Sequence, residues 1–403
     1  MAPSSWYNGQ TYLDTMNPDA VGKFIAETHE KYKRECGQEF GKAIPGIFTD
    51  EPSYGNVMGI RDQRPWTSCL PVKFKERYGY DLVEHLPELF FNIPGNDFST
   101  ARYDYYRLCT DLFTAAFAQQ VGEWCEKNHL EFTGHALYED DMITQRAAIG
   151  DAMRFYEFQQ LPGIDLLTEH SDHIDTAKQC SSVAHQLDRP NRLCEVYGCT
   201  GWDFGFAGHK ALGDWLQVLG INFRVQHLAW YSMRGEAKRD YPASISFQSS
   251  WWPHYSAVED YFARQRAILD PAKEVRDILV INPIESMWGY RPNPSDKEHQ
   301  DYCNRHQVDL RNMLLGNHLD FDYGCEDMLP RYSSVTAPLP EEELWDKGPR
   351  FQVGVARYST VILPPMETIR ATTLELLEKF AAAGGAVYFL DDAPAHLDGQ
   401  ENA

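Results

Sequence analysis

Two glutamates, each in or at the end of a short apolar run, carry the clearest chemical potential of this chain. Glu51 ends the run in segment 44–52 (IPGIFTDEP), and Glu195 lies in segment 192–198 (RLCEVYG). Apolar runs of this length are typical of buried strands. An acid at the carboxyl end of such a strand is typical of the active-site face of a β/α barrel. The alternative, which Asp50 alone would fit, is an acid that caps the following helix.

Glycoside hydrolysis requires two carboxyl groups on opposite sides of one bond, one protonated and the other ionised. Glu51 and Glu195 fit this pair if they lie across the mouth of one barrel. Asp50 is a like charge beside Glu51 and would raise a carboxyl pKa, but adjacent strand residues point to opposite faces. We therefore expect at most one of the two to point into the site. For Glu195, a buried salt bridge with Arg192 or Arg224 is the structural alternative.

Further polar and aromatic residues near other predicted strand ends are candidate substrate-binding residues. They are Asp14, Asp50, His135, Glu139, Glu169, His170, Tyr197 and Trp251. Sugar clefts combine flat aromatic faces with polar rims, so we expect one ring of the pair Trp251-Trp252 to be a sugar platform. His135 would contact substrate or be an ordinary hydrogen-bonded histidine.

Segment 169–173 (EHSDH) supports an alternative, because His, Asp and Glu are all metal ligands. This interpretation would make the chain a metal-dependent barrel hydrolase. A metal-dependent amidohydrolase barrel carries His-x-His on its first strand, which we expect to be absent from this chain. We therefore assign no metal ligands, and expect one or two residues of the segment to bind a substrate hydroxyl.

The elements that must position these residues alternate along the chain. Six predicted strands, at about 12, 47, 133, 166, 195 and 227, are each followed by a predicted helix or a long loop. The first of them covers residues 10–15. Such alternation implies a parallel sheet, and no Gly-rich dinucleotide turn follows an early strand. We predict an α/β fold, a (β/α)8 TIM-type barrel over residues 1–271 that lacks its first two strands, as a truncated chain would. Glu51 would then lie on the fourth barrel strand and Glu195 on the seventh.

The composition changes after about residue 272. Predicted strands at 276–283, 319–323, 358–364 and 386–390 alternate with predicted helices at 299–316 and 370–382. This pattern predicts a second α/β domain, flavodoxin-like or amidotransferase-like, over residues 272–403. It contains no nucleophile elbow and no phosphate-binding glycine loop, so we expect its role to be structural or inter-subunit.

Charge and composition exclude several classes of partner. The 403-residue chain has a net charge of −22, which disfavours nucleic acid and anionic membranes. No run approaches the roughly 20 apolar residues of a membrane span. The N-terminus shows no signal peptide, so the default expectation is a cytoplasmic protein. The nine cysteines contain no CxxC pair and are expected to be reduced. The pattern does not indicate an oligomeric state.

Four motifs carry a resemblance to a known family. They are 48–52 (FTDEP), 134–136 (GHA), 194–198 (CEVYG) and 245–252 (ISFQSSWW). They resemble the large barrel glycosidases of glycoside hydrolase family 106, which are α-L-rhamnosidases and ulvan-type polysaccharide degraders. The domain order is also similar to that of β-galactosidase-like enzymes. The resemblance implies an acid on the fourth strand and its partner on the seventh, matching Glu51 and Glu195. It also implies an inverting reaction, a calcium ion as a candidate cofactor, and a glycoside, oligosaccharide or polysaccharide as substrate.

A second hypothesis is that the chain has the predicted fold but no catalytic activity. The chain departs from the family pattern in the missing barrel start and the missing β-sandwich domains. It would then be a non-catalytic remnant of a glycosidase that binds carbohydrate.

Overall fold

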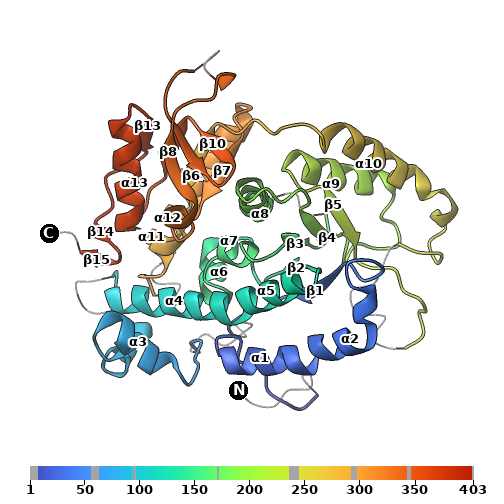
Figure 1. Ribbon diagram of the computed structural model, residues 1–403, viewed down its shortest axis with the longest axis horizontal. Helices are drawn as coiled ribbons and strands as arrows, with labels where there is room; N and C mark the ends of the chain where they lie inside the picture. Colours follow the sequence, from blue (N-terminus) through green and yellow to red (C-terminus); the bar gives the residue numbers. More distant parts are fainter. Residues whose placement is uncertain are drawn as a thin grey trace.

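Two groups of mainly parallel strands, each packed against helices, make up the molecule (Figure 1). The computed structural model describes residues 8–55, 63–92, 94, 97–169, 172–235, 245–291, 297–342 and 346–401. The first group belongs to the N-terminal part, residues 8–271, and the second to the C-terminal part, residues 272–401. Of the candidate site residues, His170 lies outside the described ranges.

The N-terminal part contains parallel strands connected through helices, as the alternation predicted. The strands are β1 (Gly46–Asp50), β2 (Glu131–His135), β3 (Gly163–Leu166), β4 (Leu193–Val196) and β5 (Phe223–Gln226). β1 pairs with β2, and β3, β4 and β5 form a second ladder in that order. The helices are α1 (Pro18–Glu27), α2 (His29–Cys36), α3 (Leu70–Tyr78), α4 (Thr100–Phe113), α5 (Gln120–Lys127), α6 (Met142–Ala148), α7 (Ala152–Tyr156), α8 (Ile174–Gln186), α9 (Phe206–Val218) and α10 (Ser256–Leu269).

β2 and β3 are neighbours although no ladder joins them. The N–H of Leu161 donates to the carbonyl of Phe132 over 3.2 Å, and a Cβ on Gly163 would lie 2.6 Å from the carbonyl oxygen of Gly134. Gly134 has a left-handed φ of +112°, and a Cβ there would lie 2.0 Å from the carbonyl oxygen of Thr49. Only glycine allows both this conformation and this approach. The five strands therefore follow one another in space in chain order.

The predicted eight-stranded barrel is matched in part. Parallel strands and their covering helices are present, whereas β1 and β5 each pair on one side only among the described residues. Closure of the strands into a barrel stays a prediction. Glu51 follows β1 and Glu195 lies on β4, so the predicted separation of three strand positions is retained.

The predicted strand at residues 10–15 is wrong. Residues 11–14 have no regular structure, and the turn at Thr15 leads directly into α1. The side chain of Asn17 caps α1, and the Thr15 hydroxyl donates to the carbonyl of Ser53 over 2.6 Å. The segment is therefore held by side-chain bonds and a helix cap instead of a ladder.

The C-terminal part is built on a parallel sheet, which the sequence pattern predicted. Its order is β13-β11-β6-β7, with α11 (Lys297–Gly316) and α13 (Ala371–Ala382) among its helices. The four strands are β6 (Ile278–Ile281), β7 (Phe321–Gly324), β11 (Thr360–Leu363) and β13 (Ala386–Phe389). Elements that were not predicted are α12 (Leu329–Tyr332), the antiparallel strands β8 (Ser333–Thr336), β9 (Arg350–Val353) and β10 (Ala356–Tyr358), and the short strands β12 (Thr368–Ile369), β14 (His396–Leu397) and β15 (Gln400–Glu401).

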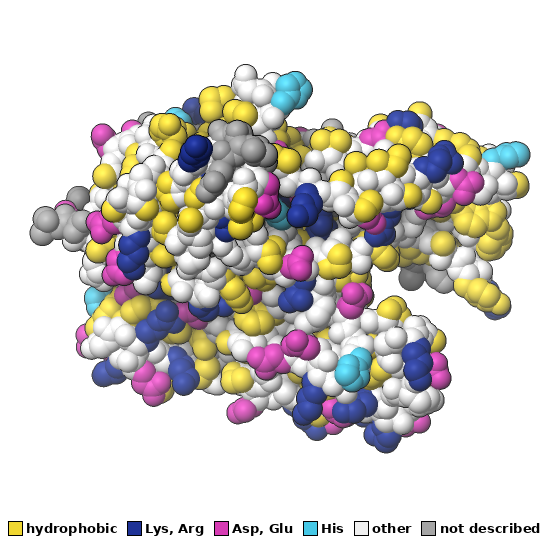
Figure 2. Space-filling view, turned by 45° about the horizontal axis from the view of Figure 1, so that its top comes forward, with side chains coloured by type: hydrophobic (Ala, Val, Ile, Leu, Met, Phe, Trp, Pro, Cys, Tyr) yellow, Lys and Arg dark blue, Asp and Glu magenta, His cyan; other side chains and the backbone are white. Residues whose placement is uncertain are grey.

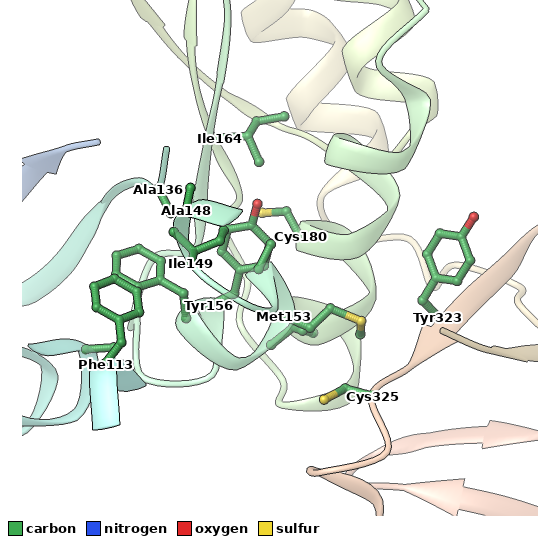
Figure 3. Packing of buried hydrophobic residues seen from close by; sticks show 14 of the residues in the cluster. Phe113, Ala136, Ala148, Ile149, Met153, Tyr156, Ile164, Cys180, Tyr323 and Cys325 are labelled. Atoms are coloured by element: carbon green, nitrogen blue, oxygen red, sulfur yellow. The ribbon is translucent and has the colours of Figure 1, made fainter. Parts of the chain in front are cut away.

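A continuous buried cluster joins the two parts. Figure 3 shows Met153 of α7 and Cys180 of α8 between Phe113 on one side and Tyr323 and Cys325 on the other. The first three residues belong to the N-terminal part and the last two to the C-terminal part. The C-terminal part also has a buried cluster of its own around Phe351 and Phe380, and the predicted division into domains at 271/272 stays a prediction.

The surface carries charged side chains of both signs, and a notch opens on one side below the arm that carries α10 (Figures 1 and 2). None of the helices in the described ranges combines the length and the apolar character that crossing a membrane requires.

Candidate active site

Neighbouring strand ends bring four ionisable side chains onto the same face. Asp50 is the register partner of His135 across β1 and β2, and Asp165 is the register partner of Glu195 across β3 and β4. In parallel strands, register partners point to the same side of the sheet. Asp50 therefore shares the face of His135, and the alternation of faces ends there because Glu51 follows the strand with a left-handed backbone.

His135 is the centre of this group, and its side chain is only 1% exposed. Its Nε2 lies 3.0 Å from Oε2 of Glu195 and 3.6 Å from Oδ1 of Asp50. Burial alone would lower the pKa of the imidazole, but the hydrogen bond to Glu195 and the charges of Glu139 and Asp165 raise that pKa to about 9. His135 is therefore a cation at neutral pH and donates a hydrogen bond to Glu195.

Glu195 is held in its ionised form by two histidines. Its Oε1 lies 3.7 Å from Nε2 of His227, and its Oε2 accepts from His135. Burial on its own would raise the pKa of Glu195, but the hydrogen bond from His135 and the two histidine charges outweigh this effect and lower the pKa. The two arginines considered as salt-bridge partners of Glu195 pair with other acids: Arg192 with Glu274 and Arg224 with Glu259.

The pKa of Glu51 is shifted in the opposite direction to that of Glu195. The N–H of Glu51 donates to the carbonyl of His135 over 3.2 Å, and its backbone is left-handed, with a φ of +48°. The residue as a whole is exposed at the strand end, but its carboxyl is partly withdrawn from water. This desolvation and the nearby carboxylates of Asp50 and Glu195 raise the pKa of Glu51, against the charge of His135. Glu51 therefore favours its protonated form more than an ordinary glutamate does.

Asp165 is a site residue that the sequence analysis missed. It lies in the middle of β3, beside Glu195, and burial raises the pKa of its carboxyl to about 7 together with the charges of Glu195, Glu51 and Asp50, while His135 lowers it. The only available signal was a single acid inside an otherwise apolar strand, in segment 163–167 (GIDLL).

Glu139 lies behind this group. Its side chain accepts from the N–H of Ala136 over 2.8 Å and from the N–H of Asp165 over 3.4 Å. It is buried, and burial raises the pKa of its carboxyl to about 8, against the charge of His135. Glu139 thus orients the loop after β2 and the backbone of β3.

Two other predicted ligands are packed among the helices. Tyr197 is fully buried, and its hydroxyl donates to the carbonyl of His209 and accepts from Arg224. Trp251 packs against the rings of Phe206 and His209 beside α9. Tyr197 therefore supports the fold from the core, and Trp251, which is half-buried, lies on the α9 side.

Asp14 and Glu169 lie at the edges of the region. The Asp14 carboxylate accepts from the hydroxyl of Thr67 over 2.7 Å and from the N–H of Met16 over 3.3 Å, so it is committed to the turn before α1. Glu169 is exposed beyond the end of β3. The structure thus brings together Asp50, Glu51, His135, Glu139 and Glu195, and it adds Asp165.

A hollow of about 560 Å³ opens at the ends of β3 and β4. Its lining combines hydroxyl groups, two acids, one aromatic ring and small residues, namely Thr168, Glu169, Cys199, Thr200, Gly201, Asp203, Phe204, Gly205 and Gly208. A polar rim with one ring is the kind of surface that binds a sugar.

The described residues do not fit the calcium ion that the resemblance implied. Calcium takes about six to eight oxygen ligands. Around the strand ends, Oδ1 of Asp165 is the buried carboxyl oxygen without a hydrogen-bond partner, and His135 adds a positive charge beside it. No group of three or more His, Cys, Asp or Glu suited to a metal occurs within the ranges that the structure describes.

A parallel α/β fold with carboxyl groups at its strand ends is the kind of structure found among glycoside hydrolases. Comparison with known families then identifies it: residues 3–315 match the family described as alpha-L-rhamnosidase, and the chain belongs to glycoside hydrolase family 106. The predicted family is confirmed.

The chain is also similar to individual proteins and to solved structures. The chain is 26% identical over 275 residues to the "Putative beta-glucuronidase" of Formosa agariphila, a match that covers 66% of this chain and 22% of that protein. The rhamnosidase structure from Novosphingobium sp. PP1Y has a TM-score of 0.68 at 20% identity and covers 96% of this chain and 35% of its own. The β-galactosidase from Halorubrum lacusprofundi has a TM-score of 0.61 at 14% identity, with coverages of 96% and 58%.

These solved structures share the fold with this chain. The chain spans about a fifth of the length of the curated relative and about a third of the length of the rhamnosidase.

Proposed function

We propose that this chain carries the active site of a glycoside hydrolase with α-L-rhamnosidase-like activity. Glu51 is the general acid and Glu195 the general base. The substrate is a glycoside, oligosaccharide or polysaccharide with a terminal L-rhamnose or similar sugar. Membership of family 106 supports the reaction class.

One observation carries the assignment of roles. Glu51 and Glu195 differ in the direction of their pKa shifts, upward for Glu51 and downward for Glu195. The backbone of Glu51 and the carboxylate of Glu195 are each hydrogen-bonded to His135. Pairs of carboxyls whose surroundings drive their pKa values apart are the usual basis of acid and base roles. His135 contributes to this separation because its charge stabilises the Glu195 carboxylate directly.

The proton transfers balance as follows in an inverting reaction. Glu51 donates its proton to the glycosidic oxygen as the bond from that oxygen to the anomeric carbon breaks. Glu195 takes a proton from a water molecule, whose oxygen bonds to the anomeric carbon from the opposite face. The cycle leaves Glu51 ionised and Glu195 protonated, and exchange with solvent restores both.

The decisive experiment replaces each acid and varies the leaving group. Glu195→Gln should lower kcat by about 100-fold or more for every aryl rhamnoside, because general-base catalysis typically contributes about 10²–10⁴. Glu51→Gln should lose a similar factor with a poor leaving group and much less with a dinitrophenyl leaving group, which needs no protonation. Unchanged turnover of the substrates with poor leaving groups in either variant would show that the replaced residue has no part in the mechanism.

Two controls accompany these variants. Glu35→Gln makes the same chemical change on the exposed surface of α2 and should leave kcat unaffected. Unfolding midpoints of all variants should stay close to that of the parent protein. NMR of the first-formed sugar tests the stereochemistry, and retention of the anomeric configuration would make Glu195 a nucleophile instead of a base.

The alternative of a metal-dependent hydrolase is not favoured by a specific observation. Its segment 169–173 includes residues outside the described ranges, and Glu169 at its start is exposed.

A further inference from the structure

We propose that Asp165 is a further substrate-contacting residue, whose carboxyl hydrogen-bonds a hydroxyl of the sugar on which Glu195 acts. This inference rests on the proposed function and refines its substrate class. It requires a sugar that carries a free hydroxyl near the bond that breaks.

Asp165 lies beside Glu195 in the sheet. Asp165 and Glu195 are register partners on the adjacent parallel strands β3 and β4. Adjacent strands lie about 4.8 Å apart, and register partners project from the same face. A sugar whose anomeric carbon lies beside Glu195 therefore has a neighbouring ring position beside Asp165.

Asp165 has an uncommitted carboxyl oxygen. Its backbone N–H donates to Glu139, but its carboxyl oxygen Oδ1 is buried and has no hydrogen-bond partner in the part of the chain that the structure describes. Burying a polar atom without a partner typically costs about 1–3 kcal/mol, so a purely structural residue would not be expected here.

Asp165 faces His135 from β2, Glu195 from β4, and Asp50 and Glu51 from the end of β1. Burial and the neighbouring carboxylates raise the pKa of Asp165 to about 7 against the charge of His135, so both of its protonation states are populated near neutral pH. A carboxyl in this condition can donate to or accept from a hydroxyl, and a sugar hydroxyl can do both.

The test is a chemical double-mutant cycle. Asp165→Asn and Asp165→Ala are each assayed with an aryl rhamnoside and with the series of monodeoxy analogues, each lacking one ring hydroxyl. With the full substrate, each variant should lose about 10- to 100-fold in kcat/KM, the usual loss for a hydrogen bond to a charged group. With the analogue that lacks the contacted hydroxyl, wild type and variants should agree within about twofold, since the lost interaction is shared.

Stability provides an independent measurement. Because the buried Oδ1 of Asp165 has no hydrogen-bond partner to lose, replacement of this residue by Asn should leave the unfolding midpoint unchanged or raise it. Asp175→Asn is the matched control: Asp175 is buried but bonded to Arg311 and Tyr323, so its replacement should lower the midpoint. It should leave the pattern across the deoxy series unchanged.

The outcomes separate this inference from the proposed function. If wild type is active and no deoxy analogue couples to Asp165, or if Asp165→Asn is as active as wild type, the inference fails while the proposed function stands. If wild type hydrolyses no rhamnoside, the proposed function fails, and binding of L-rhamnose then decides through its effect on the unfolding midpoint. A stabilising effect on wild type that is lost in Asp165→Asn supports the inference, and an effect kept in the variant or absent from both overturns it.

Discussion

The Nε2–H of His135 donates a hydrogen bond to Glu195. This bond and carboxyl groups from separate strands raise the pKa of the imidazole, so that it is a cation at neutral pH. Its role follows from this arrangement. The imidazole does not need to touch substrate to act, because it lowers the pKa of Glu195, the proposed general base. In this respect His135 is a positioning residue.

The first prediction concerns the pH dependence of His135→Gln. Without the imidazolium, the pKa of Glu195 should rise, because burial is then opposed only by His227. The acidic limb of the kcat/KM profile should therefore move to higher pH, and the loss of activity should be larger at pH 5 than at pH 7. Steady-state assays across pH 4–9 check this.

His227→Gln is the matched control for that measurement. His227 lies 3.7 Å from Glu195 and makes a weaker contact than His135 at 3.0 Å. Its replacement should move the acidic limb less. An equal or larger shift in His227→Gln would contradict the central role of His135.

Sequence reasoning at this scale reached the residues whose signal is local. Glu51 and Glu195 stand out because an acid interrupts or ends an apolar run. Asp165 gives the same signal inside a four-residue strand, but its importance depends on the register between β3 and β4. The charge of His135 depends on carboxyls that come from distant parts of the chain, so no local pattern contains it.

At the scale of elements, the close contact between β1 and β2 positions the site. Gly134 lies one residue before His135, and its missing side chain lets the backbone of β2 approach Thr49. Any displacement here would move His135 and the strand end that carries Glu51.

The second prediction is that Gly134→Ala is severely destabilising. A Cβ at this position would lie 2.0 Å from the carbonyl oxygen of Thr49, on a left-handed backbone. Overpacking and the backbone conformation together should cost about 3 kcal/mol or more of unfolding free energy. Gly79→Ala is the control: its φ is +81° but nothing lies within 4 Å, so about 1 kcal/mol is expected. Urea unfolding of both variants checks this, and equal losses would contradict the steric argument.

The parallel elements could be predicted because short apolar strands alternate with segments of helical hydrophobic spacing, and this alternation is visible in the sequence. The segment at residues 10–15 (QTYLDT) contains threonine and tyrosine, which favour strands. The Asn17 cap and the Thr15–Ser53 hydrogen bond nevertheless hold its end as a turn before α1. The antiparallel strands β8–β10 are three or four residues each, and such short strands carry too little pattern to be recognised.

At the scale of the molecule, the core and a buried ionic group join the two parts. Asp322 of β7 accepts from Arg276 over 2.6 Å, from the Tyr358 hydroxyl over 2.7 Å, and from His185 of α8 over 2.5 Å. These charges outweigh the effect of burial and hold the pKa of Asp322 well below its usual range. The site-bearing strands are therefore supported through α8 by the C-terminal sheet.

The third prediction is that the protein becomes less stable as the pH rises from 6 to 9. The pKa of His135 is raised from 6.5 to about 9 on folding, so its contribution is complete below pH 6.5 and is lost through about pH 9. This shift in the pKa of His135 corresponds to about 3 kcal/mol of unfolding free energy. Asp165 and Glu139 act in the same direction, because their pKa values rise to about 7 and about 8, and folding favours their protonated forms.

Urea titrations at pH 6 and pH 9 measure this change. The three groups influence one another, so their contributions do not add. His135→Gln should flatten the dependence, and a stability that is constant from pH 6 to pH 9 in the parent protein would contradict the assignment of charge to His135.

The crowding of carboxyl groups around one histidine also determines which inhibitors should succeed. Asp50, Glu51, Asp165 and Glu195 outnumber the positive charge of His135, so an amine placed at the anomeric position would be attracted by several of them. A basic iminosugar should therefore bind more tightly than its neutral lactam counterpart, and its advantage should shrink in Glu195→Gln and at low pH, where the acids are neutral. For this protein, inhibitor design that starts from a protonated nitrogen would use the same excess of negative charge that, together with burial, raises the pKa of Glu51.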